Sequence, residues 1–300
     1  MNHPVAAQQM SVDTSERTLG VRRAAVCTTR TERTRLFQSP LALVENLRCD
    51  GARPGRGPEA FSAEFQVCLP YRGLFVWHVG QDAVVGDSNQ VLFVSGGETY
   101  HVSEPLAGGY AELIVTPAID LLADVAEASA DHLPSHPLFR RRTRRADPDL
   151  QNRRARFLHW ASHANWNGVA AEELLLGLLR SALDVRVPAC SPGPPTRRLI
   201  RRTKEFVEGH LSAPLRLSDV ARAVGASPAY LTHVFRCVEG VPLHKYVVQL
   251  RLARALAELP HADDLTALAL DLGFSSHSHF TAAFRSAFHC TPSEFRDSTR

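Results

Sequence analysis

Residues 217–236 read LSDVARAVGASPAYLTHVFR, and this stretch decides the fold of the C-terminal part of the chain. Ser218 is placed to cap a short first helix, which Gly225 ends, because serine favours the N-cap of a helix and glycine its C-terminal cap. Ser227 followed by Pro228 is typical of the start of a second helix. The stretch therefore predicts two short helices joined by a tight glycine turn.

The second helix of this pair has one apolar and one polar face. Leu231, Val234 and Phe235 recur at the spacing of a buried helical face. A polar outer face with small residues suits entry into the major groove of DNA. The outward residues, which we predict to contact DNA, are Ala229, Thr232, His233 and Arg236.

The same arrangement occurs a second time, in residues 265–288. Apolar residues at helical spacing predict a first helix, Gly273 makes the turn, and Ser276 caps a second helix that buries three phenylalanines. The outward residues of this second helix, also predicted to contact DNA, are His277, Ser278, His279, Thr281 and Arg285.

A strong helix-forming segment over 246–259 connects the two pairs, and a helix over 197–211 with a basic outer face precedes them. The connecting helix would be about 20 Å long at 1.5 Å per residue. Such a rigid rod can hold both outward helices against one face of DNA, in major grooves about 34 Å apart. If the rod is shorter than this period, the DNA must bend.

The motifs of residues 197–300 follow one another in a specific order. They are Leu217 to Ala221, Ser227 to Leu231, Phe235-Arg236, Arg251-Leu252, Ala255, Leu268 to Phe274, Ser278 to Phe280, Phe284-Arg285 and Thr291 to Arg296. With these residues the segment resembles the AraC/XylS family of bacterial transcription regulators. A single helix-turn-helix match would be weak, whereas two in this order with this connecting helix and this ending are highly specific.

The resemblance implies a cytoplasmic regulator that binds double-stranded DNA at promoter sites, more often an activator than a repressor, and that contacts RNA polymerase. Three residues depart from the family pattern. Ala282 and His233 stand where arginine is common, and the loss of such a DNA contact is worth about 1 to 3 kcal/mol. His289 replaces a frequent glycine, which predicts a strained turn before Thr291.

The N-terminal part has a different pattern, in which short apolar runs are separated by Gly, Pro, Asn and Asp. The clearest runs span 65–69, 74–77, 83–85 and 91–94. They predict closely spaced antiparallel strands, followed from Pro117 by helices. The stretch from Arg140 to Arg145 is basic and is expected to be a solvated loop.

By resemblance, this part is the cupin-like sensory half of such regulators, whose family role is to bind a small-molecule effector or to form a homodimer. The residues quoted for it are Leu69 to Gly73 and Asn89 to Phe93. Candidate residues of an effector pocket are Arg72, Trp77, Tyr100 and His101. Aromatic residues on strands are, however, more often part of a core.

Composition bounds the class of protein. The 300 residues are 44% hydrophobic and 22% charged with a formal net charge of +3, which fits a globular protein of two folded parts. The six cysteines form no Cys-x-x-Cys pair, so we expect reduced thiols in the cytosol. The N-terminal residues include no apolar run, so we expect neither a signal peptide nor a membrane anchor.

The predicted fold is therefore α+β with two domains: a cupin-like β-barrel with packed helices, then an all-α domain of two helix-turn-helix units joined by a linker helix. The predicted boundaries are a mobile tail over 1–35, the cupin-like domain over 36–187, a Pro- and Gly-rich linker over 188–196, and the DNA-binding domain over 197–300.

Two other hypotheses remain beside the regulator. The first is a cupin-type metalloenzyme with an appended helical domain, for which His78, Glu98 and His101 are the candidate ligands. The chain has no His-x-His pair at those positions to place two imidazoles on one strand face, so we expect no metal, cofactor or catalytic residues. The second is a protein-interaction bundle, which the polar outer faces disfavour because they offer little hydrophobic area.

Overall fold

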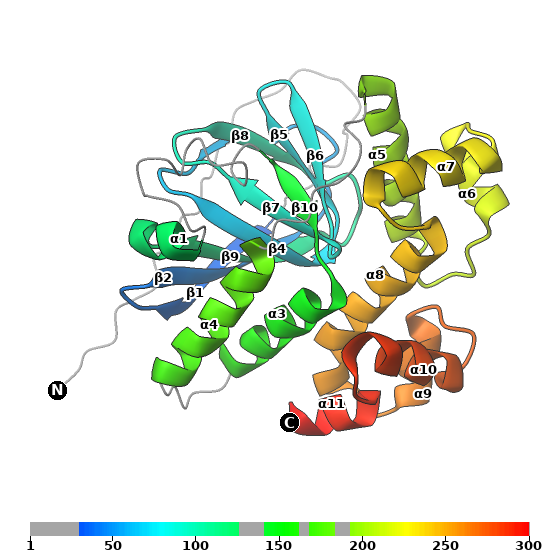
Figure 1. The fold of residues 1–300 in the computed structure, drawn as a ribbon. Coiled ribbons are helices and arrows are strands. Elements are labelled where there is room, and N and C mark those ends of the chain that lie inside the picture. The colour runs from blue at the N-terminus through cyan, green and yellow to red at the C-terminus, as the bar shows by residue number, and fades with distance from the viewer. Residues whose placement is uncertain (1–29, 126–140, 162–167, 184–192, 300) are drawn as a thin grey trace, which may run out of the picture.

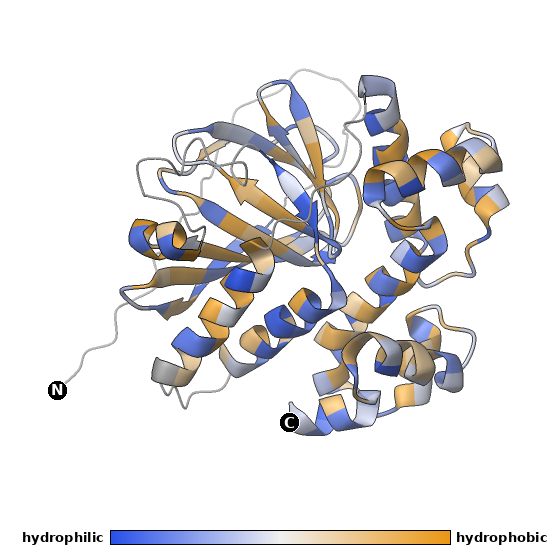
Figure 2. Cartoon of the chain, viewed as in Figure 1, coloured by the Kyte–Doolittle hydropathy of each residue, from blue (hydrophilic) through white to orange (hydrophobic). Residues whose placement is uncertain are grey.

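The computed structural model describes residues 30–125, 141–161, 168–183 and 193–299. A β-rich N-terminal half packs against a helical C-terminal half (Figure 1). Hydrophobic residues concentrate on the strands of the N-terminal half and alternate with hydrophilic residues along the helices (Figure 2). Among the described residues, no helix combines the length and hydrophobicity that crossing a membrane requires.

The N-terminal strands form two antiparallel sheets. The larger sheet has the order β1 (Arg30–Gln38), β2 (Ala42–Asp50), β9 (Tyr110–Pro117), β4 (Gln66–Gly73), β7 (Gln90–Val94) and β10 (Thr143–Arg145). The smaller sheet has the order β3 (Glu59–Phe61), β8 (Thr99–Ser103), β5 (Phe75–Val79) and β6 (Asp82–Gly86). The two sheets face each other over a core that includes Phe75, Trp77, Leu92 and Ile114. In the described chain they stay separate sheets, so the closed cupin-like barrel is not confirmed.

Three helices cover the other face of the larger sheet. They are α1 (Ile119–Val125), α3 (Pro148–Ala161) and α4 (Gly168–Leu183). Alternating residues of β2, β4, β7 and β9, such as Val44, Leu69, Phe93 and Leu113, point toward Phe157 and the leucines of α4. This alternation places one side of each strand between the sheets and the other side under the helices.

The C-terminal half consists of helices. They are α5 (Pro194–Gly209), α6 (Leu217–Val224), α7 (Pro228–Glu239), α8 (Leu243–Glu258), the 3-10 turn η2 (Leu259–His261), α9 (Leu265–Asp271), α10 (His277–Phe288) and α11 (Pro292–Ser298). One core surrounds Phe235, Tyr246 and Leu250, and a second surrounds Leu256 and Phe284. Helix α8 contributes to both cores and so joins the two helix-turn-helix units, as expected.

The structure corrects the expected N-terminal tail. Residues 30–35 belong to β1, which pairs with β2 from Arg30 opposite Asp50 onward. This strand lies at the edge of the sheet and exposes nearly every side chain, so it has no apolar period by which to recognise it. The rest of the predicted tail lies outside the described residues.

The basic stretch is not the expected solvated loop either. Thr143–Arg145 forms β10, which pairs with β7. Arg144 donates to the carbonyl oxygens of Ser181 and Ala182 at the end of α4, and Arg142 pairs with Glu98. The guanidinium groups of Arg142 and Arg144 therefore bind protein acceptors, whereas Nη1 and Nη2 of Arg145 are buried without a hydrogen-bond partner. Arg140 lies outside the described residues.

Two helix starts also differ from expectation. Helix α5 begins at Pro194, inside the predicted linker, because proline is well tolerated in the first turn of a helix. Helix α6 begins at Leu217, with Arg216 as its N-cap residue and no side-chain cap, so Ser218 lies within the helix instead of capping it. The remainder of the predicted linker lies mostly outside the described residues.

Candidate DNA interface

The first helix-turn-helix unit is built by local signals. Helix α6 ends at Gly225, whose φ of 70° lies in the left-handed region that glycine adopts readily. Helix α7 begins after Ser227, whose Oγ accepts a hydrogen bond from the Tyr230 N–H at 3.2 Å. The turn between the two helices therefore follows from a glycine and a capping serine, as the sequence predicted.

Helix α7 presents the four predicted side chains to solvent. Leu231, Val234 and Phe235 are buried in the first core. The predicted contact residues Ala229, Thr232, His233 and Arg236 are all exposed. Tyr230 also lies in the exposed first turn, with 53% of its surface accessible, although it is not among the four predicted residues. In the sequence, Tyr230 is an aromatic residue that does not fit the apolar spacing of this helix, and this could have identified it as an outward residue.

The second unit has the same construction with an additional cap. Asp264 Oδ1 accepts hydrogen bonds from the Thr266 and Ala267 N–H groups at 2.7 and 3.2 Å, and this fixes the start of α9. Ser276 Oγ accepts from the His279 N–H at 3.1 Å and caps α10, as predicted. At Gly273, with φ of 85°, a Cβ would lie 2.6 Å from the Leu211 carbonyl oxygen. Glycine is therefore needed in this turn for its conformation and for space.

Helix α10 presents a second polar face. Ser278, His279 and Arg285 are exposed, while His277 and Thr281 are half-buried. Ala282 and Ser286 share this face. Together with every predicted residue of α10 except His279, they line one shallow hollow. The structure thus gathers four of the five predicted contact residues of α10 around the exposed methyl group of Ala282.

Helix α8 fixes the two units relative to each other. It has 16 residues, with Tyr246 and Leu250 in the first core and Leu252 and Leu256 in the second. The buried Arg251 donates from Nε to the Leu211 carbonyl at 3.0 Å. These contacts tie the chain between α5 and α6 to the middle of α8, so both outward helices belong to one packed assembly (Figure 1).

The turn after α10 has the strained geometry that the sequence predicted. His289 has φ of 61° and is the only non-glycine residue with positive φ within the described ranges. Thr291 then forms a capping box with Glu294, because the Thr291 N–H donates to Glu294 Oε2 at 2.7 Å and Thr291 Oγ1 accepts from the Glu294 N–H at 3.2 Å. These bonds lower the pKa of Glu294.

Comparison with known proteins agrees with this geometry. A family model described as a helix-turn-helix domain matches residues 220–298. The regulatory protein SoxS of Salmonella typhimurium is 35% identical over 101 residues, which are 33% of this chain and 94% of SoxS. The chain belongs to the AraC/XylS family. It is a DNA-binding transcriptional regulator.

Two further proteins match a similar share of the chain. The regulatory protein PocR of Salmonella typhimurium is 34% identical over 98 residues. The match covers 32% of this chain and 32% of PocR, so this chain spans about a third of the length of PocR. The crystal structure of an AraC-type regulator from Chromobacterium violaceum is 30% identical, with a TM-score of 0.33, and covers 36% of this chain and 96% of that one.

The candidate effector residues of this AraC/XylS-family protein are only partly brought together. Trp77 is buried between the sheets, with its ring centroid 5.6 Å from that of Tyr100. His101, next in sequence to Tyr100, binds the Gly57 carbonyl oxygen through Nδ1 at 3.0 Å. Arg72 is instead exposed on β4 and donates to the Gly108 carbonyl oxygen at 3.0 Å. The pair of Trp77 and Tyr100 is the part of the predicted pocket that the fold assembles.

The candidate metal ligands each have another partner. His78 Nε2 lies 2.9 Å from Ser103 Oγ, His101 binds Gly57, and Glu98 pairs with Arg142. Burial lowers the pKa of His78. Within the described ranges, no three His, Cys, Asp or Glu side chains gather as a metal-binding group.

Glu112, on β9 of the N-terminal half, is not among the residues predicted from the sequence. It lies on β9 between Tyr110 and Ile114, on the side that faces the core between the sheets. It is buried, Oε2 has no hydrogen-bond partner, and burial raises the pKa of the carboxyl group to about 8. A lone acidic residue at an inward position of an otherwise apolar strand was the signal that could have identified it.

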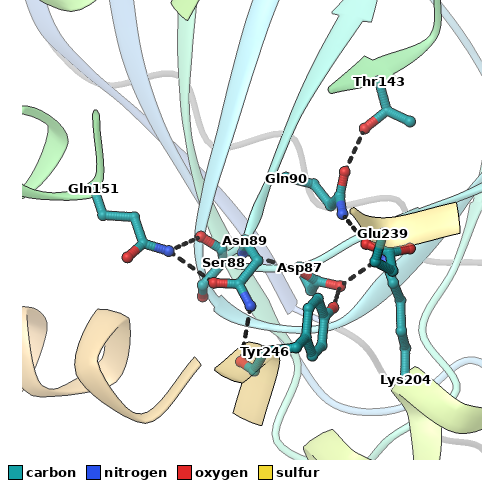
Figure 3. A network of polar contacts seen from close by, with 9 residues as sticks. All are labelled: Asp87, Ser88, Asn89, Gln90, Thr143, Gln151, Lys204, Glu239 and Tyr246. Atoms are coloured by element: carbon teal, nitrogen blue, oxygen red, sulfur yellow. Dashed lines mark hydrogen bonds and ion pairs between the residues drawn. The ribbon is translucent and has the colours of Figure 1, made fainter. Parts of the chain in front are cut away.

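A buried polar network joins the N-terminal half to the first helix-turn-helix unit (Figure 3). Lys204 of α5 is 4% exposed and lies 3.4 Å from Asp87 Oδ2 and 3.0 Å from Glu239 Oε1, at the end of α7. The Tyr246 hydroxyl of α8 donates to Asp87. Gln90 Nε2 donates to Glu239 Oε2 at 2.9 Å.

The network also reaches helix α3 of the N-terminal half. Asn89 donates from Nδ2 to the Tyr246 carbonyl oxygen at 3.1 Å, and Gln151 of α3 donates to Asn89 at 2.8 Å. Burial would lower the pKa of Lys204, but the Asp87 and Glu239 carboxylates outweigh burial and raise it. We call the residues of Figure 3, 87–90, Thr143, Gln151, Lys204, Glu239 and Tyr246, the interdomain network.

Proposed function

We propose that this regulator recognises a specific site in duplex DNA by placing α7 and α10 in successive major grooves on one face of the double helix. The observation that carries the proposal is that two capped helices, each with an exposed polar face, belong to one assembly built on α8. Arg236 and Arg285 supply positive charge for guanine or phosphate, and Thr232 and His279 supply hydrogen-bonding groups.

The length of α8 supports a bent binding site. Its 16 residues span about 24 Å at 1.5 Å per residue, which is shorter than the 34 Å repeat of the major groove. Two recognition helices joined by so short a rod reach successive grooves only if the DNA curves toward the protein. We therefore expect the preferred sites to contain flexible steps between two contacted segments.

The proposal extends to the sensory half and to transcription. A cupin-like sensory half would bind a small-molecule effector near Trp77, Tyr100 and the carboxyl group of Glu112, whose Oε2 has no hydrogen-bond partner. The interdomain network would carry the change to α7, because Glu239 ends that helix. By family resemblance, the regulator forms a homodimer in the cytoplasm and activates transcription through contact with RNA polymerase.

The test is selection of bound sequences from random DNA with the full chain, followed by affinity measurements on the selected site. Arg236→Ala and Arg285→Ala are each expected to weaken binding about tenfold or more, since a specific base contact is worth about 1 to 3 kcal/mol. Arg35→Gln is the matched control, because Arg35 is an exposed arginine on β1, outside the helical half.

Two results would contradict the proposal. The first is a selection that yields no preferred sequence. The second is a selected site to which both arginine variants bind as tightly as the Arg35→Gln control does. Transcription in vitro from a promoter with the selected site, with and without the regulator, tests activation separately.

A further inference from the structure

The shallow hollow on the outward face of α10 has one apolar point in a polar surface. Its lining residues are His277, Ser278, Thr281, Ala282, Arg285 and Ser286. Ala282 is the one member of this lining whose side chain has no hydrogen-bonding group. Its methyl group is exposed, with Ser278 one helical turn before it and Ser286 one turn after it.

The position of this methyl group is fixed by the packing of α10. Phe280, Phe284 and Phe288 are buried in the second core of the helical half, and the Ser276 hydroxyl caps the start of the helix. Alanine has no side-chain rotamers, so a contact with its methyl group costs no side-chain ordering. The hollow therefore presents the Ala282 methyl group in one defined place.

Thymine is the base whose major-groove edge matches this surface. All four bases present hydrogen-bonding groups in the major groove, and thymine adds the C5-methyl group. A donor or acceptor pressed against Ala282 would lose its water without gaining a partner, which is costly. Two methyl groups in contact remove apolar surface from water, which is favourable. A base in contact with Ala282 is therefore expected to be thymine.

We propose that Ala282 reads one thymine of the binding site by contact between its methyl group and the C5-methyl group of the base. Arg285, three residues further along the same face, would then reach a guanine or a phosphate beside that thymine. The inference rests on the proposed placement of α10 in a major groove and adds a base preference at one position of the site.

The experiment compares thymine with uracil in the DNA, because uracil lacks only the C5-methyl group. In the site selected with the full chain, each thymine is replaced by deoxyuridine in turn and the affinity is measured. At the position that faces Ala282 we expect about fourfold weaker binding, which corresponds to the burial of one methyl group.

A second pair of bases tests the methyl group apart from thymine. At the same position the T·A pair is replaced by C·G, and cytosine is compared with 5-methylcytosine. The methylated base is expected to bind more tightly than cytosine by a similar factor, because the Ala282 contact depends on the methyl group and not on the rest of the base.

Three variants locate the contact. Ala282→Gly removes the methyl group and is expected to bind thymine and uracil equally at that position. Ala257→Gly makes the same change at an exposed position of α8, so it carries the same loss of helix propensity and should keep the preference for thymine. Thr281→Ser removes the other methyl group of the hollow, from a half-buried residue, and should also keep the preference.

The ratio of the affinities for thymine and uracil separates this inference from the proposed function. The inference is wrong if no thymine responds to the loss of its methyl group, if the response persists in Ala282→Gly, or if Thr281→Ser or Ala257→Gly abolishes it. Arg285→Ala tests the placement of α10 independently. If Arg285→Ala weakens binding while uracil does not, α10 still contacts the DNA and only the role of Ala282 is refuted. If neither change weakens binding, the placement of α10 in the groove fails as well.

Discussion

Glu112 shows how strongly one side chain can depend on its surroundings. Its carboxyl group sits among apolar neighbours between the sheets, and burial raises its pKa from 4.5 to about 8. The folded chain therefore keeps a proton on Glu112 at a pH at which the unfolded chain has released it. Because the folded state binds more protons between pH 4.5 and about 8, Glu112 makes the free energy of unfolding fall as pH rises through this window.

The change Glu112→Gln is expected to remove this fall in the free energy of unfolding with rising pH. Glutamine is similar in shape to the protonated acid and does not ionise. The variant should gain stability over the natural chain on going from pH 5 to pH 8, by a few kcal/mol at most. Urea unfolding at the two pH values measures the difference. Glu64→Gln, at an exposed position, is the control, and a parallel pH response of the natural chain and Glu112→Gln would refute the assignment.

At the scale of single elements, α7 and α10 have the same construction but carry different side chains on their outward faces. The outward face of α10 contains Ala282, an exposed methyl group surrounded by polar residues. The first unit offers Arg236 and the exposed aromatic ring of Tyr230. We therefore expect α7 to contribute more to sequence discrimination than α10 does.

Ala282→Arg is expected to strengthen DNA binding by about tenfold and to steepen its dependence on salt by about one counterion, because the new side chain reaches a base or a phosphate. Affinity measured over a series of salt concentrations gives both quantities. Ala83→Arg, which adds the same charge at an exposed position of β6, serves as the control. If both variants bind DNA more tightly by the same factor, the effect comes from net charge, and α10 does not enter the major groove.

The elements that the sequence predicted are those specified by local chemistry. Gly225, Ser227, Gly273 and Ser276 fix the two turns through their own backbone preferences and caps. The elements that it missed depend on partners far along the chain. Strand β10 forms because its backbone pairs with β7.

The candidate site also has a part that local sequence specifies and a part that depends on contacts between distant residues. Outward positions of a regular helix follow from its period, so all four selected residues of α7 are exposed. The interdomain network joins residues such as Asp87 and Tyr246, which are 159 positions apart, and no periodicity encodes such a contact.

At the scale of the whole molecule, the interdomain network holds the two halves in one arrangement through buried charges. Lys204 forms ion pairs with two buried carboxylates, Asp87 and Glu239. Removal of one partner from a buried ion pair leaves uncompensated charge, at a cost of about 3 to 5 kcal/mol. The same removal would also release the end of α7 from the N-terminal half.

Lys204→Met is therefore expected to lower the melting temperature and to separate one calorimetric transition into two, one for each half. Lys245→Met, at an exposed position of α8, is the matched control and should melt as the natural chain does. Neutralising the partners in the triple variant Lys204→Met, Asp87→Asn, Glu239→Gln should restore part of the lost stability. A single, unshifted transition in Lys204→Met would mean that the network does not hold the halves together.

Helix α8 belongs to both hydrophobic cores of the helical half. A chain cut inside α8 would leave each fragment with an incomplete interior, so neither helix-turn-helix unit is a portable module. Recombination between relatives can then transfer DNA specificity only if both helix-turn-helix units are exchanged together. New operator preferences must otherwise arise by substitutions on the outward faces of the recognition helices.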